Sequence, residues 1–344
     1  MSTTWKRSVK IRNYILDQID SGQGRIAQKV SRNFGISTQA ANRHLNHLTE
    51  AKIIVATGRT RNRQYKLKAI HNEQFNFVIN RDLKEDFIWR KYINPIFSAL
   101  LDEKLINKNV FDICHYGFTE MFNNVIDHSK GRRVIAGVLV DVRKIELSVL
   151  DDGIGIFKNL QDYFNLEDEK HAILELAKGK VTTDPDRHTG EGIFFTSRML
   201  DRFSLISNLL SYIRNEGADW LIKNQDDLLK GTRVTMKISN KSKRTMQEVF
   251  RRYEDDDYGF TKTIVPVELA RYEGQKLISR SQAKRLLAGL DRFKVVMLDF
   301  KGVKSIGRAF ADEIFRVFQL EYPDVKLVPV NMSQDVKKSI SSVI

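Results

Sequence analysis

Four short segments, each marked by acidic, amide or glycine residues, follow one another along the central part of the chain. In the first, FTEMFNNVIDHS (residues 118–129), Glu120, Asn124 and Asp127 recur at the spacing that places side chains on one face of a helix. A separate apolar face consists of Phe118, Phe122 and Val125. The pattern predicts a helix with one buried side and one side of carboxylates and an amide. Taken alone, it also fits an amphipathic helix whose polar side faces water.

The second segment, ELSVLDDGIGIF (residues 146–157), predicts a strand that runs into Asp151, Gly153 and Gly155. A carboxylate at a strand end can accept a hydrogen bond from the exocyclic amine of adenine. Glycines after it allow the backbone to come close to a ligand. An Asp-Asp-Gly sequence is also an ordinary turn signal, so this segment alone does not decide between a ligand site and a turn.

The third segment, RHTGEGIFFTSRML (residues 187–200), has Gly190 and Gly192 before a helical run. Glycines that open a helix expose backbone N–H groups at the positive end of its dipole, which favours phosphate binding. In the fourth segment, LLKGTRVTMKI, the pair Gly231 and Thr232 comes just before a predicted strand. Each of these two patterns is weak by itself.

The order of the four segments resembles the GHKL ATP-binding family, which includes gyrase B subunits, heat-shock chaperone ATPases, mismatch-repair ATPases and sensor histidine kinases. The resemblance covers about residues 86–240. It implies an α/β sandwich of the Bergerat type, with ATP and Mg²⁺ as cofactors.

The resemblance also implies roles for individual residues. Asn124 would coordinate the Mg²⁺ that bridges the phosphates, Asp151 would bind adenine, and Glu120 would be the catalytic residue that polarises the attacking water. The remaining expected ligand-binding residues are Gly153 and Gly155 at the base, Gly190 and Gly192 at the phosphates, Thr232 on the adenine side, and Asp127 as a support of the pocket.

The central region departs from the family in two respects. No histidine-bearing dimerisation helix pair, which a sensor kinase needs, precedes residue 118. Glu191 lies between the two glycines of the third segment and adds negative charge near the phosphates, so turnover is expected to be slow. Four basic residues of this region either reach phosphate or are solvated: Lys178, Lys180, Arg187 and His188.

Residues 1–70 carry 14 Lys and Arg against three Asp and Glu, whereas the rest of the chain is nearly neutral. A basic module attached to a neutral body is typical of a protein that binds a phosphate backbone. Helices are expected at about residues 5–19, 23–33 and 37–51, followed by two strands, IIVATG and QYKLKAI. These elements resemble a winged helix-turn-helix over about residues 5–69.

The third predicted helix has a core side, formed by Ala41, Leu45 and Leu48. Its opposite side carries residues whose side chains can pair with base edges in the major groove of double-stranded DNA, namely Gln39, Asn42, Arg43 and Asn46. The basic wing between the strands contains Arg59, Arg61 and Arg63. Many winged helices bind protein instead, so a protein partner for this module stays open.

Alternating strands and helices beyond residue 258 predict a small α/β domain. The run from VVMLDF through GVKSIG into the helix with Phe310, Ile314 and Phe318 resembles the STAS-like domains, which are related to anti-sigma-factor antagonists. In those antagonists a GHKL-type kinase phosphorylates a serine at the start of the helix. Gly307-Arg308-Ala309 stands there in this chain and only Ser305 is near, so an interaction domain that binds a protein partner without phosphorylation is expected.

Apolar runs, the N-terminal residues and the cysteine count indicate where a protein of this sequence is expected to reside. No apolar run approaches the roughly 18 residues of a membrane span. The charged N-terminal residues lack the apolar centre of a signal peptide. A single cysteine, Cys114, can form no internal disulfide. A cytoplasmic protein without membrane contact is expected.

The sequence therefore predicts an α+β multidomain protein with three parts. These are a winged helix at residues 1–70, a GHKL domain at 86–240 and a STAS-like domain at 258–344, joined by a polar stretch (71–85) and a charged helical connector (241–257). The expected function is a homodimeric, nucleotide-switched DNA-binding protein that regulates transcription and has weak ATPase activity. Two alternatives stay open: a serine/threonine or histidine protein kinase, and a DNA-directed ATPase of defence or remodelling.

Overall fold

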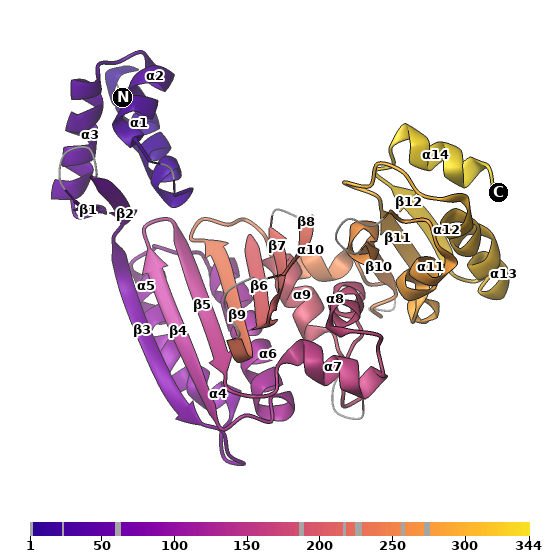
Figure 1. Cartoon of the computed structure of the whole chain (residues 1–344). Coiled ribbons are helices and arrows are strands. Elements are labelled where there is room, and N and C mark those ends of the chain that lie inside the picture. Colours follow the sequence, from indigo (N-terminus) through magenta and orange to yellow (C-terminus); the bar gives the residue numbers. More distant parts are fainter. Residues whose placement is uncertain are drawn as a thin grey trace. The chain divides into compact units, whose positions relative to one another are not determined.

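The computed structural model describes residues 3–22, 24–58, 63–185, 189–215, 218–223, 229–255, 259–271 and 276–344 (Figure 1). The chain forms two compact units. The first comprises residues 1–72 with residues 139–145, and the second comprises residues 73–138 with residues 146–344.

The first unit contains three helices and a hairpin, as expected: α1 (Thr3–Asp20), α2 (Ile26–Phe34), α3 (Thr38–Glu50), β1 (Ile54–Thr57) and β2 (Gln64–Leu67). The two strands pair antiparallel. Helix α3 begins after Ser37, whose hydroxyl accepts the backbone N–H of Ala40 at 3.1 Å and so satisfies a donor of the first turn.

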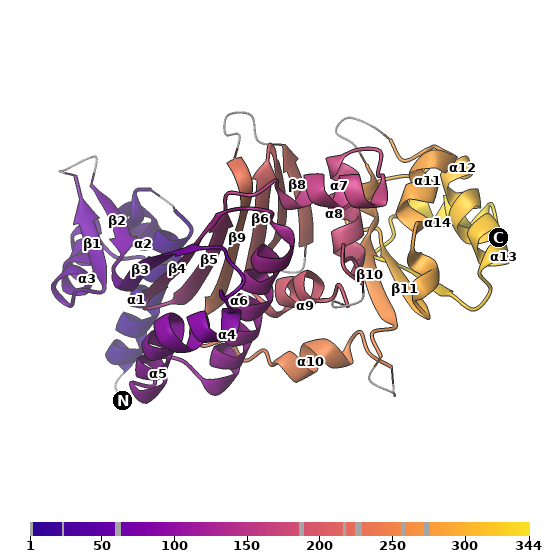
Figure 2. The same ribbon diagram turned by 90° about the horizontal axis from the view of Figure 1, so that it is seen from below.

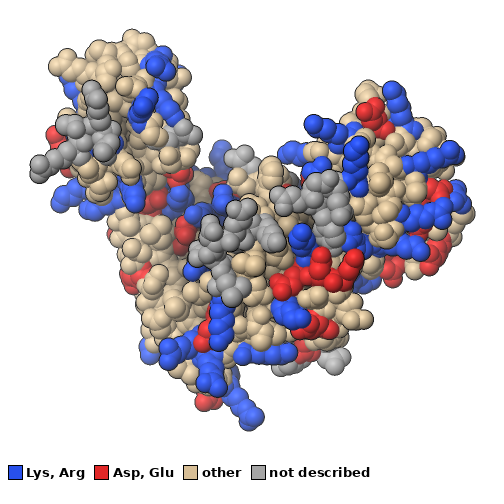
Figure 3. Space-filling view, in the orientation of Figure 1, with Lys and Arg blue, Asp and Glu red and all other residues tan. Residues whose placement is uncertain are grey.

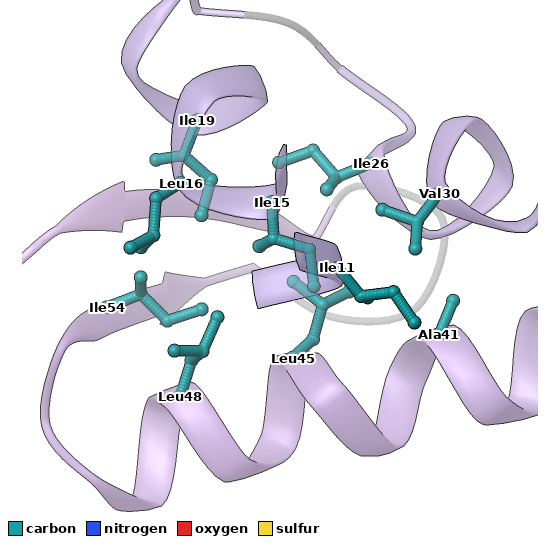
Figure 4. Close-up of a cluster of buried hydrophobic side chains, with 10 residues drawn as sticks. All are labelled: Ile11, Ile15, Leu16, Ile19, Ile26, Val30, Ala41, Leu45, Leu48 and Ile54. Carbon is teal, nitrogen blue, oxygen red and sulfur yellow. The ribbon is translucent and has the colours of Figure 1, made fainter. Parts of the chain in front are cut away.

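Apolar side chains from all three helices and from β1 meet in one buried cluster: Ile11, Ile15, Leu16, Ile19, Ile26, Val30, Ala41, Leu45, Leu48 and Ile54 (Figure 4). The expected core side of α3 is thereby confirmed. Burial of these side chains removes apolar surface from water, which is the main source of stability for so small a unit.

A seven-stranded sheet organises the central part of the chain. Its strands are β3 (Ala69–Val78), β4 (Arg133–Asp141), β5 (Lys144–Asp151), β6 (Arg202–Asn208), β7 (Leu210–Asn215), β8 (Ala218–Lys223) and β9 (Leu229–Ser239). Their order in the sheet is β3-β4-β5-β9-β6-β7-β8, and β6 pairs antiparallel with both β7 and β9.

Two expectations about this region were wrong. Much of the polar stretch expected at residues 71–85 belongs to an edge strand, β3, because a strand with one solvated face alternates and need not be apolar throughout. Thr232 and Gly231 lie within β9 rather than before it, where the register with β6 shifts next to Ser207.

The helices of the central part are α4 (Glu85–Ile88), α5 (Asn94–Asp102), α6 (Lys108–His128), α7 (Ile156–Phe164), α8 (Glu169–Lys178), α9 (Gly192–Met199) and α10 (Met246–Arg251). Helices α6, α8 and α9 contact strands of the sheet, whereas α7 packs on α8 and α10 packs on α6 and α9. Figures 1 and 2 show α5, α6 and α9 on one face of the sheet. In β5 the residues turned toward this face are buried, namely Ile145, Leu147, Val149 and Asp151. In the described part of the expected connector, residues 241–255, the short helix α10 begins with a capping box formed by Thr245 and Glu248.

The C-terminal part has a three-stranded parallel sheet in the order β10 (Lys262–Pro266), β11 (Val295–Asp299) and β12 (Lys326–Val330). The helices that alternate with these strands are α11 (Arg280–Leu287), α12 (Arg308–Asp312), α13 (Gln319–Glu321) and α14 (Gln334–Ser341). Between α12 and α13 the backbone is π-helical (Glu313–Phe318). The expected core residues are buried: Phe310 in α12, and Ile314 and Phe318 in the π-helical stretch. The protein is therefore of the α+β class, with both parallel and antiparallel sheets.

Candidate functional site

Helix α6 forms one wall of a cavity of about 290 Å³ in the second unit. Residues from all four motif segments line it: Glu120, Asn124, Asp151, Gly155, Gly190, Gly192 and Thr232. The volume is just below the usual range for small-molecule sites, roughly 300–1,000 Å³. Residues far apart in the sequence therefore line one cavity.

Asp151 is the buried acid of this cavity. It is the last residue of β5, and its side chain is 2% exposed. Its carboxylate accepts the backbone N–H of Gly153 at 2.8 Å and also that of Thr232. Burial disfavours the charged form and raises the pKa of Asp151 to about 6, although the two hydrogen bonds oppose this shift. A carboxylate held in this way presents an acceptor to a ligand that carries an amine.

The turn after β5 brings the backbone close to the neighbouring strands. Gly155 has a φ of +88°, and a β-carbon at this position would lie 2.4 Å from the hydroxyl oxygen of Ser207. Only glycine fits there. The hydroxyl of Thr232 accepts the backbone N–H of Ile156 at 3.0 Å, which ties the start of α7 to β9. Gly153 shapes this turn through its bond to Asp151 and is not among the described residues that line the cavity.

Asn124 has an unsatisfied side chain. Its Nδ2 atom is buried and has no hydrogen-bond partner among the described residues. Such an atom costs about 1–3 kcal/mol unless a ligand or water supplies the missing partner. Since the two ends of an amide are assigned by their surroundings, the side chain can present either oxygen or nitrogen to a ligand.

This amide fits the chemistry of a Mg²⁺ site that depends on phosphate. Mg²⁺ keeps several waters and takes one or two protein ligands beside phosphate oxygens. Among the residues that the structure describes, no three His, Cys, Asp or Glu side chains are gathered to hold a metal ion. Asn124 would thus hold the ion together with a phosphorylated ligand. Asp127, expected on the same helical face, is not among the described residues that line the cavity.

The acidic end of the cavity lies where α9 begins. Burial raises the pKa of Glu191, while Lys180 and a hydrogen bond from Thr189 counteract this effect. Burial also raises the pKa of Tyr116, and the charges of Glu120 and Glu191 add to the shift. The carboxylates of Glu120 and Glu191 therefore both lie near Tyr116 at this end of the cavity. Either carboxylate can orient a water molecule by accepting its hydrogen bond.

Sequence reasoning missed several lining residues: Asn123, His128, Ser129, Thr182, Thr183 and Thr189. His128 lies one helical turn after Asn124, and this spacing was a signal that could have found it. Its Nδ1 atom lies 3.0 Å from the hydroxyl of Thr183. That contact joins α6 to a segment 55 positions later, and no local pattern announces it.

The expectation for Lys178 was wrong, because it neither faces the cavity nor is solvated. Its side chain is fully buried, and its ammonium group donates to Glu175 Oε1 at 2.5 Å. Lys180 is partly buried against Phe260 and Phe293. Arg187 and His188 lie outside the described residues.

The expected DNA-contacting side chains of α3 are all exposed: Gln39, Asn42, Arg43 and Asn46. Arg63, next to β2, is exposed as well, whereas Arg59 and Arg61 lie outside the described residues. Figure 3 shows Lys and Arg side chains on the surface of this unit. The polar face of α3 is thus available for contact with a partner.

Comparison with known proteins identifies the C-terminal part. Residues 282–337 match the family described as a STAS-like domain of unknown function (DUF4325), so the chain contains a STAS-like domain. The matched range begins within α11 and ends within α14. No curated protein matches the chain. None of the helices in the described ranges has the length and apolar character that crossing a membrane requires.

Proposed function

We propose that this protein binds ATP with Mg²⁺ in the cavity beside α6 and that the bound nucleotide sets its affinity for double-stranded DNA. One observation carries the proposal. Residues of four separate motif segments, represented by Glu120, Asp151 and Thr232, line a single cavity. The expected adenine acceptor, Asp151, is buried, and the expected phosphate glycine Gly192 lies against Glu120.

The proposed roles follow the chemistry of each side chain. Asp151 accepts the amine of adenine, and Thr232 supports the turn beneath the base through its bond to Ile156. The amide oxygen of Asn124 provides the protein ligand for Mg²⁺. Its amide nitrogen, which has no partner among the described residues, donates to a phosphate oxygen. When bound, Mg²⁺ neutralises charge on the phosphates. Glu120 orients the attacking water, which gives weak ATPase activity.

The DNA-binding role rests on the first unit. In the proposed function that unit acts as a winged helix, with α3 facing the major groove and the β1–β2 hairpin facing the DNA backbone. It is supported by the excess of basic residues in residues 1–70 and by the exposed polar face of α3, which includes Arg43 and Asn46. ATP that binds one conformation better than the other shifts the population of the two, and in a homodimer this would change how two copies of α3 meet DNA. A transcription regulator is the class of protein that uses such a switch.

A single experiment separates this proposal from its alternatives. The purified full chain is incubated with Mg²⁺ and ATP labelled on the γ-phosphate, with and without duplex DNA. Slow release of free phosphate, together with a DNA affinity that differs between ATP and ADP, is the expected result. Label on the protein would favour a kinase instead. Release that requires DNA, with no difference in DNA affinity between nucleotides, would favour a DNA-directed ATPase. Absence of saturable nucleotide binding would refute the proposal.

A further inference from the structure

Lys178 connects the wall of the cavity to the STAS-like domain. It is the last residue of α8, and its ammonium group donates to the backbone carbonyls of Arg285 at 3.0 Å and Ala288 at 2.9 Å. Those carbonyls belong to the end of α11, where the last carbonyls of a helix have no partner within it. A cation at this end also interacts favourably with the helix dipole. Because the side chain is fully buried, its positive charge depends on these partners and on Glu175.

The C-terminal part, through β10 and the matched STAS-like region, also holds the backbone on both sides of Gly179. The hydroxyl of Thr263 in β10 donates to the carbonyl of Lys178 at 2.7 Å. The guanidinium of Arg292 donates to the carbonyl of Lys180 at 2.8 Å. These two hydrogen bonds from the C-terminal part therefore fix the path of the chain as it leaves α8. Helix α8 lies next to β10 (Figure 1).

Gly179 fits between two aromatic rings. Its φ is +86°, and a β-carbon would lie 2.8 Å from a ring carbon of Phe194 and 2.9 Å from one of Phe260. Phe194 belongs to α9, which begins at the cavity, whereas Phe260 packs on Phe293 beside the three-stranded sheet with ring centres 5.3 Å apart. The ring centres of Phe194 and Phe260 are 4.7 Å apart. One packed cluster therefore joins α8, α9 and the C-terminal part.

Two residues after Gly179 the chain reaches the cavity wall. Val181 lines the cavity, and its backbone N–H donates to the carbonyl of Gly190 at 3.1 Å. Gly190, which accepts this hydrogen bond, and Gly192 line the same cavity. The residues held by the STAS-like domain are thus directly adjacent to those expected to hold phosphate.

We propose that the STAS-like domain regulates the nucleotide site by holding residues 178–181 against Gly190, so that docking of the domain and binding of nucleotide stabilise each other. This inference rests on the proposed nucleotide binding. Coupling between two sites is reciprocal, so nucleotide must strengthen docking by the same factor by which docking strengthens nucleotide affinity. A partner protein that displaced the STAS-like domain from α8 would thereby release the nucleotide.

The test uses the full chain and two matched arginine variants. Arg292→Ala removes the bond to the Lys180 carbonyl, and Arg316→Ala removes an exposed arginine of the same domain that pairs with Asp312. The affinity for a non-hydrolysable ATP analogue with Mg²⁺ is measured by calorimetry. Amide hydrogen exchange of residues 280–287 is followed with and without the analogue.

We expect Arg292→Ala to weaken analogue binding by about fivefold or more, the lower end of usual coupling factors, and Arg316→Ala to leave it unchanged. The analogue should slow exchange in residues 280–287 of the wild-type chain, and less so in Arg292→Ala. Equal affinity of all three proteins, with no effect of the analogue on exchange, would overturn the regulatory inference while the proposed nucleotide site stood. A wild-type chain that binds no analogue would overturn both.

Discussion

The carboxylate of Glu120 lies against the backbone of Gly192, so close that a β-carbon at position 192 would come within 2.1 Å of Glu120 Oε2. Glu120 belongs to the middle of α6, whereas Gly192 is the first residue of α9. The contact joins the first motif segment to the third. In the proposed site it positions the carboxylate at the end of a helix whose dipole favours phosphate.

Replacing Glu120 by glutamine separates hydrolysis from binding. Glu120→Gln keeps the shape of the side chain but removes the charge that orients water. We expect turnover to fall by about 10²-fold or more, the usual scale for loss of a general base. Nucleotide affinity should stay within a few-fold, because the base acts in the transition state. Phosphate release and calorimetry measure the two effects. Glu191→Gln is the matched control, and a normal rate in Glu120→Gln with a slow one in Glu191→Gln would assign the role to the other acid.

A methyl group at position 192 should displace the same carboxylate. Gly192→Ala is expected to fold, because the end of the Glu120 side chain can rotate away from the new β-carbon. Hydrolysis should fall as it does in Glu120→Gln. The double variant should be no slower than either single one, since both act through one contact. Additive losses of rate would show that Gly192 acts in another way.

Loss of the Asn124 amide should remove Mg²⁺-dependent nucleotide binding. Asn124→Ala deletes the buried amide nitrogen that has no partner among the described residues, so the fold is not expected to lose a hydrogen bond. Titration calorimetry with ATP should show at least a tenfold weaker affinity when Mg²⁺ is present, equivalent to about 1.4 kcal/mol. Asn80→Ala, at an exposed position outside the cavity, is the control. Wild-type affinity in Asn124→Ala would exclude the site.

The buried acid should make stability depend on pH. The pKa of Asp151 rises from 3.8 to about 6 on folding, so between these values the folded state binds more protons than the unfolded state. The free energy of unfolding should therefore fall as the pH rises from about 4 to about 6, by up to about 3 kcal/mol. Asp151→Asn keeps an oxygen acceptor for Gly153 but cannot ionise. As the pH rises across this range, the thermal midpoint of the wild type should fall relative to that of Asp151→Asn. A difference between the two midpoints that does not change with pH would contradict the raised pKa of Asp151.

DNA binding by the full chain should depend strongly on salt. With about six to eight phosphate contacts, affinity should fall roughly 10³- to 10⁴-fold between 50 and 200 mM salt. Arg43→Ala on the exposed face of α3 should reduce discrimination between sequences, while Arg63→Ala beside β2 should weaken all sequences alike. Fluorescence anisotropy with several duplexes tests both. A flat salt response would instead point to a protein partner for this unit.

Local sequence patterns were sufficient to predict most of the helices and strands and some of the residues that line the cavity. The spacing of Glu120 and Asn124 places both on one helical face, because 3.6 residues per turn holds for any helix. Both residues do line the cavity. The burial of Phe310 and Ile314 was predictable for the same reason, although the backbone becomes π-helical from Glu313. The pairing of β3 with β4 was missed, since it depends on a strand more than fifty positions away.

The sequence by itself determined which residue types are present and which helix faces they share, since these follow from the covalent geometry of the backbone over one or two turns. Tertiary structure alone decided that Lys178 is buried between α8 and α11, and that Glu120 meets Gly192. Both contacts join segments that are distant in the sequence. Their geometry depends on how whole helices pack, because close packing leaves each side chain only the space that its neighbours do not fill.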